Sequence, residues 1–155
     1  MAIDDLAIRR YDVAAFRGAH ASGDTRLDPS LLDADSGGEA VVGVAKLAQW
    51  FLVELMTARG SVPHAPSRGT TFFPELHRGR LRSEADVFAA FGFAVGDLQA
   101  AARLTESPSD PADERFADAE LLAVAILPGY ARLTISIRSR AGSTRQAILP
   151  VSTLT

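Results

Sequence analysis

The chain contains 155 residues, of which 47% are hydrophobic and 23% are charged, and it has no cysteine. This length fits one domain with a normal hydrophobic core, and the composition excludes a chain that is mainly disordered. Without cysteine the chain forms no disulfides, no cysteine-ligated zinc site and no catalytic thiol. No run of about 18 apolar residues occurs and the first residues lack the layout of a signal peptide, so we expect neither a membrane span nor secretion.

The net charge of −3 argues against a dedicated nucleic-acid binder, but the charges are unevenly distributed. Residues 1–40 carry eight acidic and four basic side chains, and residues 83–120 carry nine acidic and two basic ones. Basic side chains prevail in residues 59–82, with five against one, and in residues 121–155, with four against none. Two interpretations follow: the segments neutralise one another within the fold, or basic and acidic faces dock on different neighbours.

The first 40 residues predict an irregular N-terminal arm, and residues 41–155 predict a single domain. Glycines and aspartate–proline or aspartate–serine pairs interrupt the arm at short intervals. Only residues 6–11 and 26–32 have the composition of brief strands. Because a long segment without strong elements is usually functional or lies on a partner, we expect the arm to do one or the other.

Residues 39–59 give the clearest helical pattern, with apolar side chains that repeat on one side at helical spacing. The expected buried side consists of Val41, Val44, Leu47, Ala48, Phe51, Leu52 and Leu55. The expected outer side consists of Lys46, Gln49, Glu54 and Thr57. Trp50 and Val53 fall among these polar residues. Either the N-terminal arm covers them, or they form a protein–protein contact, in which tryptophan is enriched at the energetic centre.

A second helix is predicted to begin at Ser83, because a capping serine followed three residues later by Asp86 forms a capping box. Before it, Gly60 is expected to end the first helix in the left-handed conformation, and residues 61–74 are expected to form a loop. Gly92 and Gly96 indicate either a close approach of another backbone or a kink. The expected buried side of the second helix consists of Val87, Phe88, Phe91, Val95, Leu98 and Ala102.

From Phe116 the apolar pattern changes to a period of two, which is typical of strands. We expect strands over residues 120–127, 133–138 and 146–152, joined by tight turns that contain glycine. The predicted fold is α+β, with two amphipathic helices packed on a small antiparallel β-meander.

Residue types that carry chemistry are present, but they do not form recognisable sites. The three histidines lack metal-ligand spacing, and no phosphate-binding glycine motif occurs. Glycoside hydrolysis needs two carboxyl groups about 5–9 Å apart, for which Glu75, Asp97 and Glu106 are candidates only because acidic residues are abundant. We therefore expect no metal, no cofactor and no catalysis.

The most informative stretch is residues 47–76, in which a helix ending in Leu-x-Thr-x-x-Gly is followed by Pro-x-x-Gly and a later leucine. These places are taken by Leu55, Thr57, Gly60, Pro66, Gly69 and Leu76. After them come a second helix, an acidic linker and a hairpin-rich C-terminus. In this pattern and order the chain resembles the baseplate-wedge family of contractile phage tails and related injection systems. Members of this family are also called sheath initiators or lysozyme-like wedge proteins.

The resemblance implies a structural component of a tail baseplate that connects wedge proteins and initiates sheath assembly, without enzymatic activity. It implies other wedge proteins and the tail sheath protein as partners, with several copies in the virion after assembly in the host cytoplasm. Glu114 and Arg115 are the counterpart of a Glu-Pro-Arg motif associated, in this family, with contacts to the helical core bundle of the wedge. The alternatives are a peptidoglycan hydrolase and a baseplate or tail-completion protein of another tail type.

The C-terminal strand is expected at the edge of the sheet, where unpaired backbone groups can accept a strand from another chain. In the family that the chain resembles, C-terminal β structure gives the first sheath ring a strand to pair with. Gln146 and Ile148 belong to this expected edge. Arg138, Arg140 and Arg145 make the adjacent turn basic, which favours an acidic partner. Removal of the last ten residues is then expected to spare baseplate incorporation and to stop sheath assembly.

Overall fold

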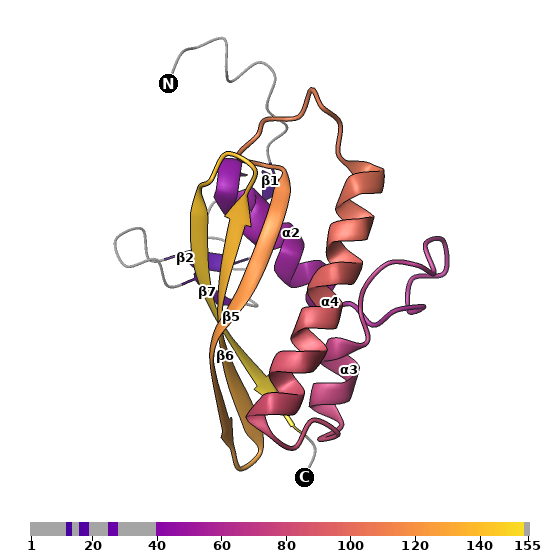
Figure 1. Cartoon of the computed structure of the whole chain (residues 1–155), viewed down its shortest axis with the longest axis vertical. Coiled ribbons are helices and arrows are strands. Elements are labelled where there is room, and N and C mark those ends of the chain that lie inside the picture. The colour runs from indigo at the N-terminus through magenta and orange to yellow at the C-terminus, as the bar shows by residue number, and fades with distance from the viewer. Residues whose placement is uncertain (1–11, 14–15, 19–24, 28–39, 154–155) are drawn as a thin grey trace.

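A computed structural model of the chain describes residues 12–13, 16–18, 25–27 and 40–153. The helices are α2 (Gly43–Met56), α3 (Phe72–His77) and α4 (Glu84–Thr105). The strands are β1 (Asp12–Val13), β2 (Phe16–Gly18), β3 (Thr25–Leu27), β4 (Ala40–Val41), β5 (Phe116–Leu127), β6 (Tyr130–Ser139) and β7 (Thr144–Ser152). The predicted α+β class is confirmed, because these helices pack on a mainly antiparallel sheet (Figure 1).

The main sheet has its described strands in the order β2-β3-β7-β6-β5. Strands β5, β6 and β7 are consecutive antiparallel neighbours, so the predicted meander is confirmed. β7 is nevertheless not an edge strand, because β3 lies beside it in parallel with Thr25 opposite Ala147. The expectation that residues 146–152 form the edge is therefore wrong, and the outer described strands are β2 and β5.

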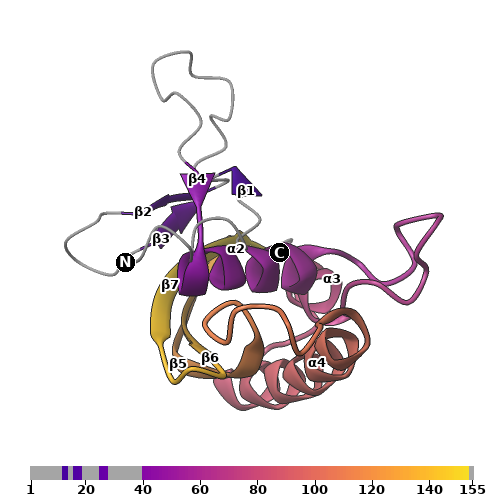
Figure 2. The same ribbon diagram turned by 90° about the horizontal axis from the view of Figure 1, so that it is seen from above.

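The described parts of the N-terminal arm are strands rather than irregular chain. β2 pairs with β3 at the side of the main sheet, and β1 pairs with β4 in a separate two-stranded ladder above α2 (Figure 2). The strand predicted over residues 6–11 lies outside the described residues. Of the strand predicted over residues 26–32, the first two residues belong to β3.

The core lies between the helices and one face of the sheet, as the period-two pattern predicts. Along β6 the side chains alternate between buried and more accessible positions, and Leu133, Ile135 and Ile137 have no exposed surface. From the helical side, the ring of Phe51 contacts the rings of Phe91 and Phe116, with centroid distances of 6.2 and 5.4 Å. A single hydrophobic cluster thus joins α2, α4 and the sheet.

Helix α2 is shorter and more enclosed than its periodicity predicts. It spans residues 43–56 instead of 39–59, and Gln49 and Glu54, expected on the outer side, are buried with 8% and 4% of their surface exposed. The helical pattern locates the apolar stripe correctly from Leu47 to Leu55, whereas Val41 lies in β4 and Val44 is only half-buried. The pattern cannot show that the loop after α2 folds back over the polar side. Glu54 is buried there because the guanidinium of Arg68, from that loop, pairs with it.

The segment between α2 and α4 contains a short helix. The prediction of a loop over residues 61–74 is therefore wrong for its last three residues, which belong to this helix. α3 occupies residues 72–77, and Phe72 and Leu76 are its buried residues. Gly60 has the predicted left-handed conformation, with φ of 81°, but it follows the extended C-cap residue Thr57 and therefore does not itself end the helix.

The start of α4 is confirmed as a capping box. The Ser83 hydroxyl accepts a hydrogen bond from the Asp86 backbone, and the Asp86 carboxylate accepts one from the Ser83 backbone. The expected buried side is correct except for Phe88, which is 43% exposed. Gly92 and Gly96 do not mark a close approach within the chain, since a Cβ added at either would meet no atom within 4 Å.

The capping box is expected to make stability depend on pH through Asp86. Hydrogen bonds from the hydroxyl and the backbone of Ser83 hold the pKa of Asp86 below its ordinary value of 3.8. A carboxyl group with a lowered folded-state pKa stabilises the fold above its unfolded pKa, and this contribution disappears as the pH falls through the folded value. Urea unfolding should show that Asp86→Asn is less stable than the natural chain at neutral pH, and that the difference shrinks in acid. A difference independent of pH would contradict this assignment.

Among the described helices, α4 is long and apolar enough to span a membrane by length and composition, with a third of its most apolar window buried in the fold. Length and composition are weak evidence, because core helices of folded domains meet the same criteria. Within the described ranges, no group of three or more histidine, aspartate or glutamate side chains is arranged to hold a metal ion.

Candidate functional site

Several predicted site residues meet at one end of the molecule, where α4 ends, the linker returns to the sheet and β6 turns into β7. The linker and the turn are joined by their backbones: Arg140 N–H donates to the Arg115 carbonyl at 2.9 Å, and Ala141 N–H donates to the Ala112 carbonyl at 3.1 Å. Arg103 on α4, Glu106 after it, Arg115 before β5 and Arg140 after β6 surround this end. We call these four residues the arginine corner.

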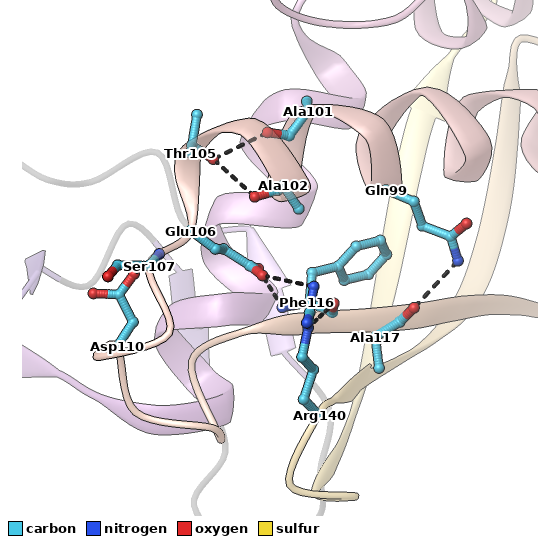
Figure 3. A network of polar contacts seen from close by, with 10 residues as sticks. All are labelled: Gln99, Ala101, Ala102, Thr105, Glu106, Ser107, Asp110, Phe116, Ala117 and Arg140. Atoms are coloured by element: carbon cyan, nitrogen blue, oxygen red, sulfur yellow. Dashed lines mark hydrogen bonds and ion pairs between the residues drawn. The ribbon is translucent and has the colours of Figure 1, made fainter.

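Glu106 connects the arginine corner to the first residues of β5 (Figure 3). Its Oε1 accepts a hydrogen bond from the Phe116 backbone N–H, and its Oε2 lies 3.3 Å from an Nη2 atom of Arg140. Gln99 of α4 donates to the Ala117 carbonyl at 3.2 Å. Side chains at the end of α4 therefore satisfy backbone groups at the start of the outer strand β5, and this fixes the position of Arg140.

A cavity of about 350 Å³ opens between these elements. Its lining consists of Arg103, Glu106, Ser107, Pro108, Arg115 and Arg140. A second cavity of about 260 Å³ adjoins it, with Arg103 and Arg140 in both linings. In the described part of the chain the Arg103 guanidinium has no hydrogen bond or ion pair, and the buried Nε of Arg115 has no hydrogen-bond partner.

The charges of the arginine corner favour an anion. Three guanidinium groups face one carboxylate, so the corner carries more positive charge than Glu106 neutralises. Guanidinium groups bind carboxylate and phosphate oxygens through pairs of N–H donors in a fixed fork. The corner can therefore hold an acidic side chain or another oxyanion without any change in the backbone.

Glu114, predicted to contact a partner, is used within the chain. Its Oε1 accepts the Gly43 backbone N–H at 3.1 Å, and its Oε2 lies 2.7 Å from Nζ of Lys46. Val42, the N-cap residue of α2, supplies no side-chain hydrogen bond. Glu114 therefore takes the role of the helix cap from 71 residues away. Of the Glu114–Arg115 pair, Arg115 is the residue left for a partner.

Trp50 and Val53 differ in exposure, although the sequence placed them together. Trp50 is half-buried against the core, with its ring centroid 5.8 Å from that of Phe116, whereas Val53 is 38% exposed. The placement of Trp50 on an open outer face is therefore wrong. At the start of β5, the Phe116 ring lies close to the rings of both Trp50 and Phe51.

We expect Trp50→Ala to lower the free energy of unfolding by about 2 kcal/mol, because a large ring loses its contact with Phe116. Val53→Ala is the matched control on the same helix and should cost less than about 0.5 kcal/mol. Urea unfolding followed by circular dichroism measures both, since the substitution removes the only tryptophan. If the two variants were equally stable, Trp50 would have to be a surface residue.

The remaining predicted partner residues are divided between the two faces of the sheet. Arg138 pairs with Asp118 on the adjacent strand, at 3.6 Å, and the register places Gln146 and Ile148 on the same outer face. Arg145 lies opposite Ile137, on the inner face, and is half-buried with an interaction inside the chain. Of the three arginines predicted around the β6–β7 turn, only Arg140 belongs to the arginine corner, where it joins the predicted Arg115.

The glycine and threonine positions of the sequence motif meet where the loop returns to the end of α2. Thr70 N–H donates to the Thr57 carbonyl at 2.9 Å, and the Thr70 hydroxyl donates to the Leu55 carbonyl at 2.8 Å. Gly69 has φ of 82°, and an added Cβ would lie 2.8 Å from the Thr57 carbonyl carbon and closer still to its oxygen. We call this contact the Thr57–Thr70 junction.

The other motif positions serve packing and turns around the junction. Leu55 and Leu76 are buried in the core, Gly60 turns in open space, and Pro66 is exposed in the loop. Arg68 in the same loop donates from Nε to the buried carboxylate of Glu54 at 2.7 Å. The hydrogen bond and charge of Glu54 raise the pKa of Arg68 above its ordinary value, so the guanidinium keeps its charge.

The three carboxylates considered for hydrolysis do not act as a pair. Glu75 lies 3.1 Å from Arg80, Asp97 lies 2.7 Å from Arg59, and Glu106 contacts Arg140. Each carboxylate therefore has its own arginine partner.

The sequence reasoning missed Gln99 and Arg103 as members of this end of the molecule. Both lie on α4, whose pattern was used only to find the buried side. A polar residue in the last turns of a helix, followed by a linker that leads to an outer strand, is a weak signal for capping of that strand.

Comparison of the chain with protein-family models, with curated proteins and with solved structures finds no significant match.

Proposed function

We propose that the protein is a structural component of a contractile-tail baseplate, which connects wedge proteins and initiates sheath assembly. The Thr57–Thr70 junction is the observation that supports this proposal. Glycines and prolines alone are explained by turns in many unrelated loops. Here Gly69 is required because the Thr57 carbonyl and the Thr57 Cγ2 methyl group occupy the space of a side chain, so two positions of the motif are in direct contact. This contact is what a motif with a structural purpose leads us to expect.

The arginine corner supports a role in contacts with other proteins. Its cations lie on three separate elements, and a partner that brings one acidic side chain would complete their hydrogen bonds. Neighbouring wedge proteins are the proposed partners at this corner. The tail sheath protein is the proposed partner elsewhere on the surface, with several copies of the subunit in each virion.

The decisive experiment is co-expression with the products of the neighbouring reading frames, followed by affinity purification. We expect a neighbouring baseplate protein to copurify with the natural chain and to be lost when Arg115 is replaced by glutamate. Arg132→Glu is the matched control, because Arg132 is an exposed arginine on β6 outside the corner. Thermal unfolding of each variant alone separates loss of binding from loss of fold.

Two results would overturn the proposal. Electron microscopy of assembled particles that locates the protein in the tube, capsid or neck would exclude a baseplate role. Release of reducing sugar from peptidoglycan, abolished by Glu75→Gln, would instead favour the hydrolase.

A further inference from the structure

The outward face of α4 is apolar and is not used by the fold. Phe93 is 80% exposed and Leu104 is 88% exposed, and their separation of eleven positions corresponds to about three helical turns, so both lie on one face. The exposed positions between them are Gly96, Ala100 and Arg103, and the half-exposed Asp97 is paired with Arg59. In both ribbon views α4 lies on the outside of the molecule (Figures 1 and 2). An exposed apolar face of this extent marks a contact surface.

The two glycines of α4 lie on this outward side and have no purpose within the chain. An added Cβ at Gly92 or Gly96 would meet no atom within 4 Å, and glycine in a helix interior costs about 1 kcal/mol relative to alanine. Glycines at the middle of a helix face let a second helix approach closely. This face therefore has the features of one side of a helix–helix contact: two glycines, Phe93 and Leu104.

The charges along α4 indicate that the partner helix is a second α4 that runs in the opposite direction. α4 begins with the acidic residues Glu84 and Asp86 and carries the basic residue Arg103 in its last turn. A second α4 packed in the opposite direction brings the basic end of one helix to the acidic end of the other. A parallel pair would instead place Arg103 beside Arg103 and Phe93 beside Phe93, without a small residue to receive the ring.

We propose that two copies of this chain form a symmetric dimer through antiparallel packing of α4 against α4. With the two-fold axis at the middle of the helix, between residues 94 and 95, Phe93 of one copy lies level with Gly96 of the other. Arg103 lies level with Asp86, and Leu104 with Ala85. Each large or charged side chain thereby meets a small or oppositely charged one, as a self-complementary interface requires.

Sedimentation equilibrium of the full chain over a range of concentrations tests the dimer. Phe93→Glu should weaken association at least 100-fold, while circular dichroism shows an unchanged fold, because the side chain is exposed. Leu122→Glu is the matched control, since Leu122 is an exposed apolar residue on β5, 42% accessible, and should leave the dimer intact. A monomer at all concentrations, or equal effects of both variants, would overturn the proposal.

The direction of packing is tested by disulfides, because the natural chain has no cysteine. In the proposed register Ala89 of one copy lies level with Ala100 of the other, whereas two copies of residue 89 are about 16 Å apart along the axis. A mixture of Ala89→Cys and Ala100→Cys chains should form the mixed disulfide, and neither chain alone should form one. Disulfides between identical chains would mean parallel packing. Insertion of α4 into lipid vesicles in place of dimer formation would identify the face as a membrane contact and refute the dimer.

Discussion

A chain that lacks residues 146–155 is expected not to fold, because this deletion removes a strand from the interior of the sheet. β7 lies between β6 and β3 and contributes Leu149 and Val151 to the core, each with 2% of its surface exposed. Burial of one such side chain stabilises a fold by about 1.5–3 kcal/mol. The deletion also leaves the backbone of β6 unpaired on the side of β7, so its total cost is comparable to the roughly 5–15 kcal/mol that a typical domain has available.

The measurement is the yield of soluble protein, together with circular dichroism and thermal unfolding of whatever is recovered. A deletion that starts after Thr153 is the control, because it retains all the pairings of β7 with β6 and the hydrogen bond from Thr153 N–H to the Gly129 carbonyl. This control should fold normally. A folded chain without residues 146–155 would restore the expectation that the last strand is a separable element for pairing with the sheath.

Gly69→Ala is expected to lower the free energy of unfolding by at least about 3 kcal/mol. About 1–2 kcal/mol arises from the left-handed conformation, since φ of 82° is unfavourable for any residue with a Cβ. The remainder arises because the methyl group would collide with the Thr57 carbonyl, which already accepts the Thr70 N–H at 2.9 Å. The loop must move away, and the hydrogen bonds of the Thr57–Thr70 junction are then lost.

Gly60→Ala separates these two contributions. Gly60 has nearly the same φ, 81°, but no atom lies within 4 Å of an added Cβ, so its substitution should cost only about 1–2 kcal/mol. Urea unfolding followed by the fluorescence of the single tryptophan measures both variants. Equal costs would mean that the backbone at Gly69 relaxes without breaking the junction, and the motif would then be turn chemistry alone.

Local patterns in the sequence predict the elements of this fold well, and they predict the neighbours of those elements less well. The alternation after Phe116 identifies β5, β6 and β7, and the spacing of Ser83 and Asp86 identifies the start of α4. Each of these signals depends on residues close together in the chain. The position of β7 beside β3 depends on residues about 120 positions apart, with Thr25 opposite Ala147, and no local pattern records it.

The errors on α2 have a related cause. The helical pattern treats polar residues as solvent-facing, but Glu54 is buried because Arg68, fourteen positions later, neutralises it. Charged residues are almost never fully buried without such a partner. The burial of Glu54 therefore follows from the path of the loop, which the sequence pattern does not specify.

The candidate site shows the same division. Arg140 could be selected from the sequence as a basic residue near a turn, and Arg115 was selected through the family resemblance. Their common cavity, and the addition of Arg103 from α4, follow from the contact between the linker and the β6–β7 turn. Glu114 was selected through the family resemblance, as part of the Glu114–Arg115 pair, but the three-dimensional structure assigns its carboxylate to α2.

The cap that Glu114 provides to α2 has a consequence for synthesis on the ribosome. A nascent chain that ends before residue 114 contains α2 without the carboxylate that completes its first turn, and without β5, β6 and β7. An isolated helix of 14 residues is marginal in water. Stable folding therefore waits until the last third of the chain has been made. During that interval the apolar side of α2 remains accessible, and it is the segment that a chaperone would bind first.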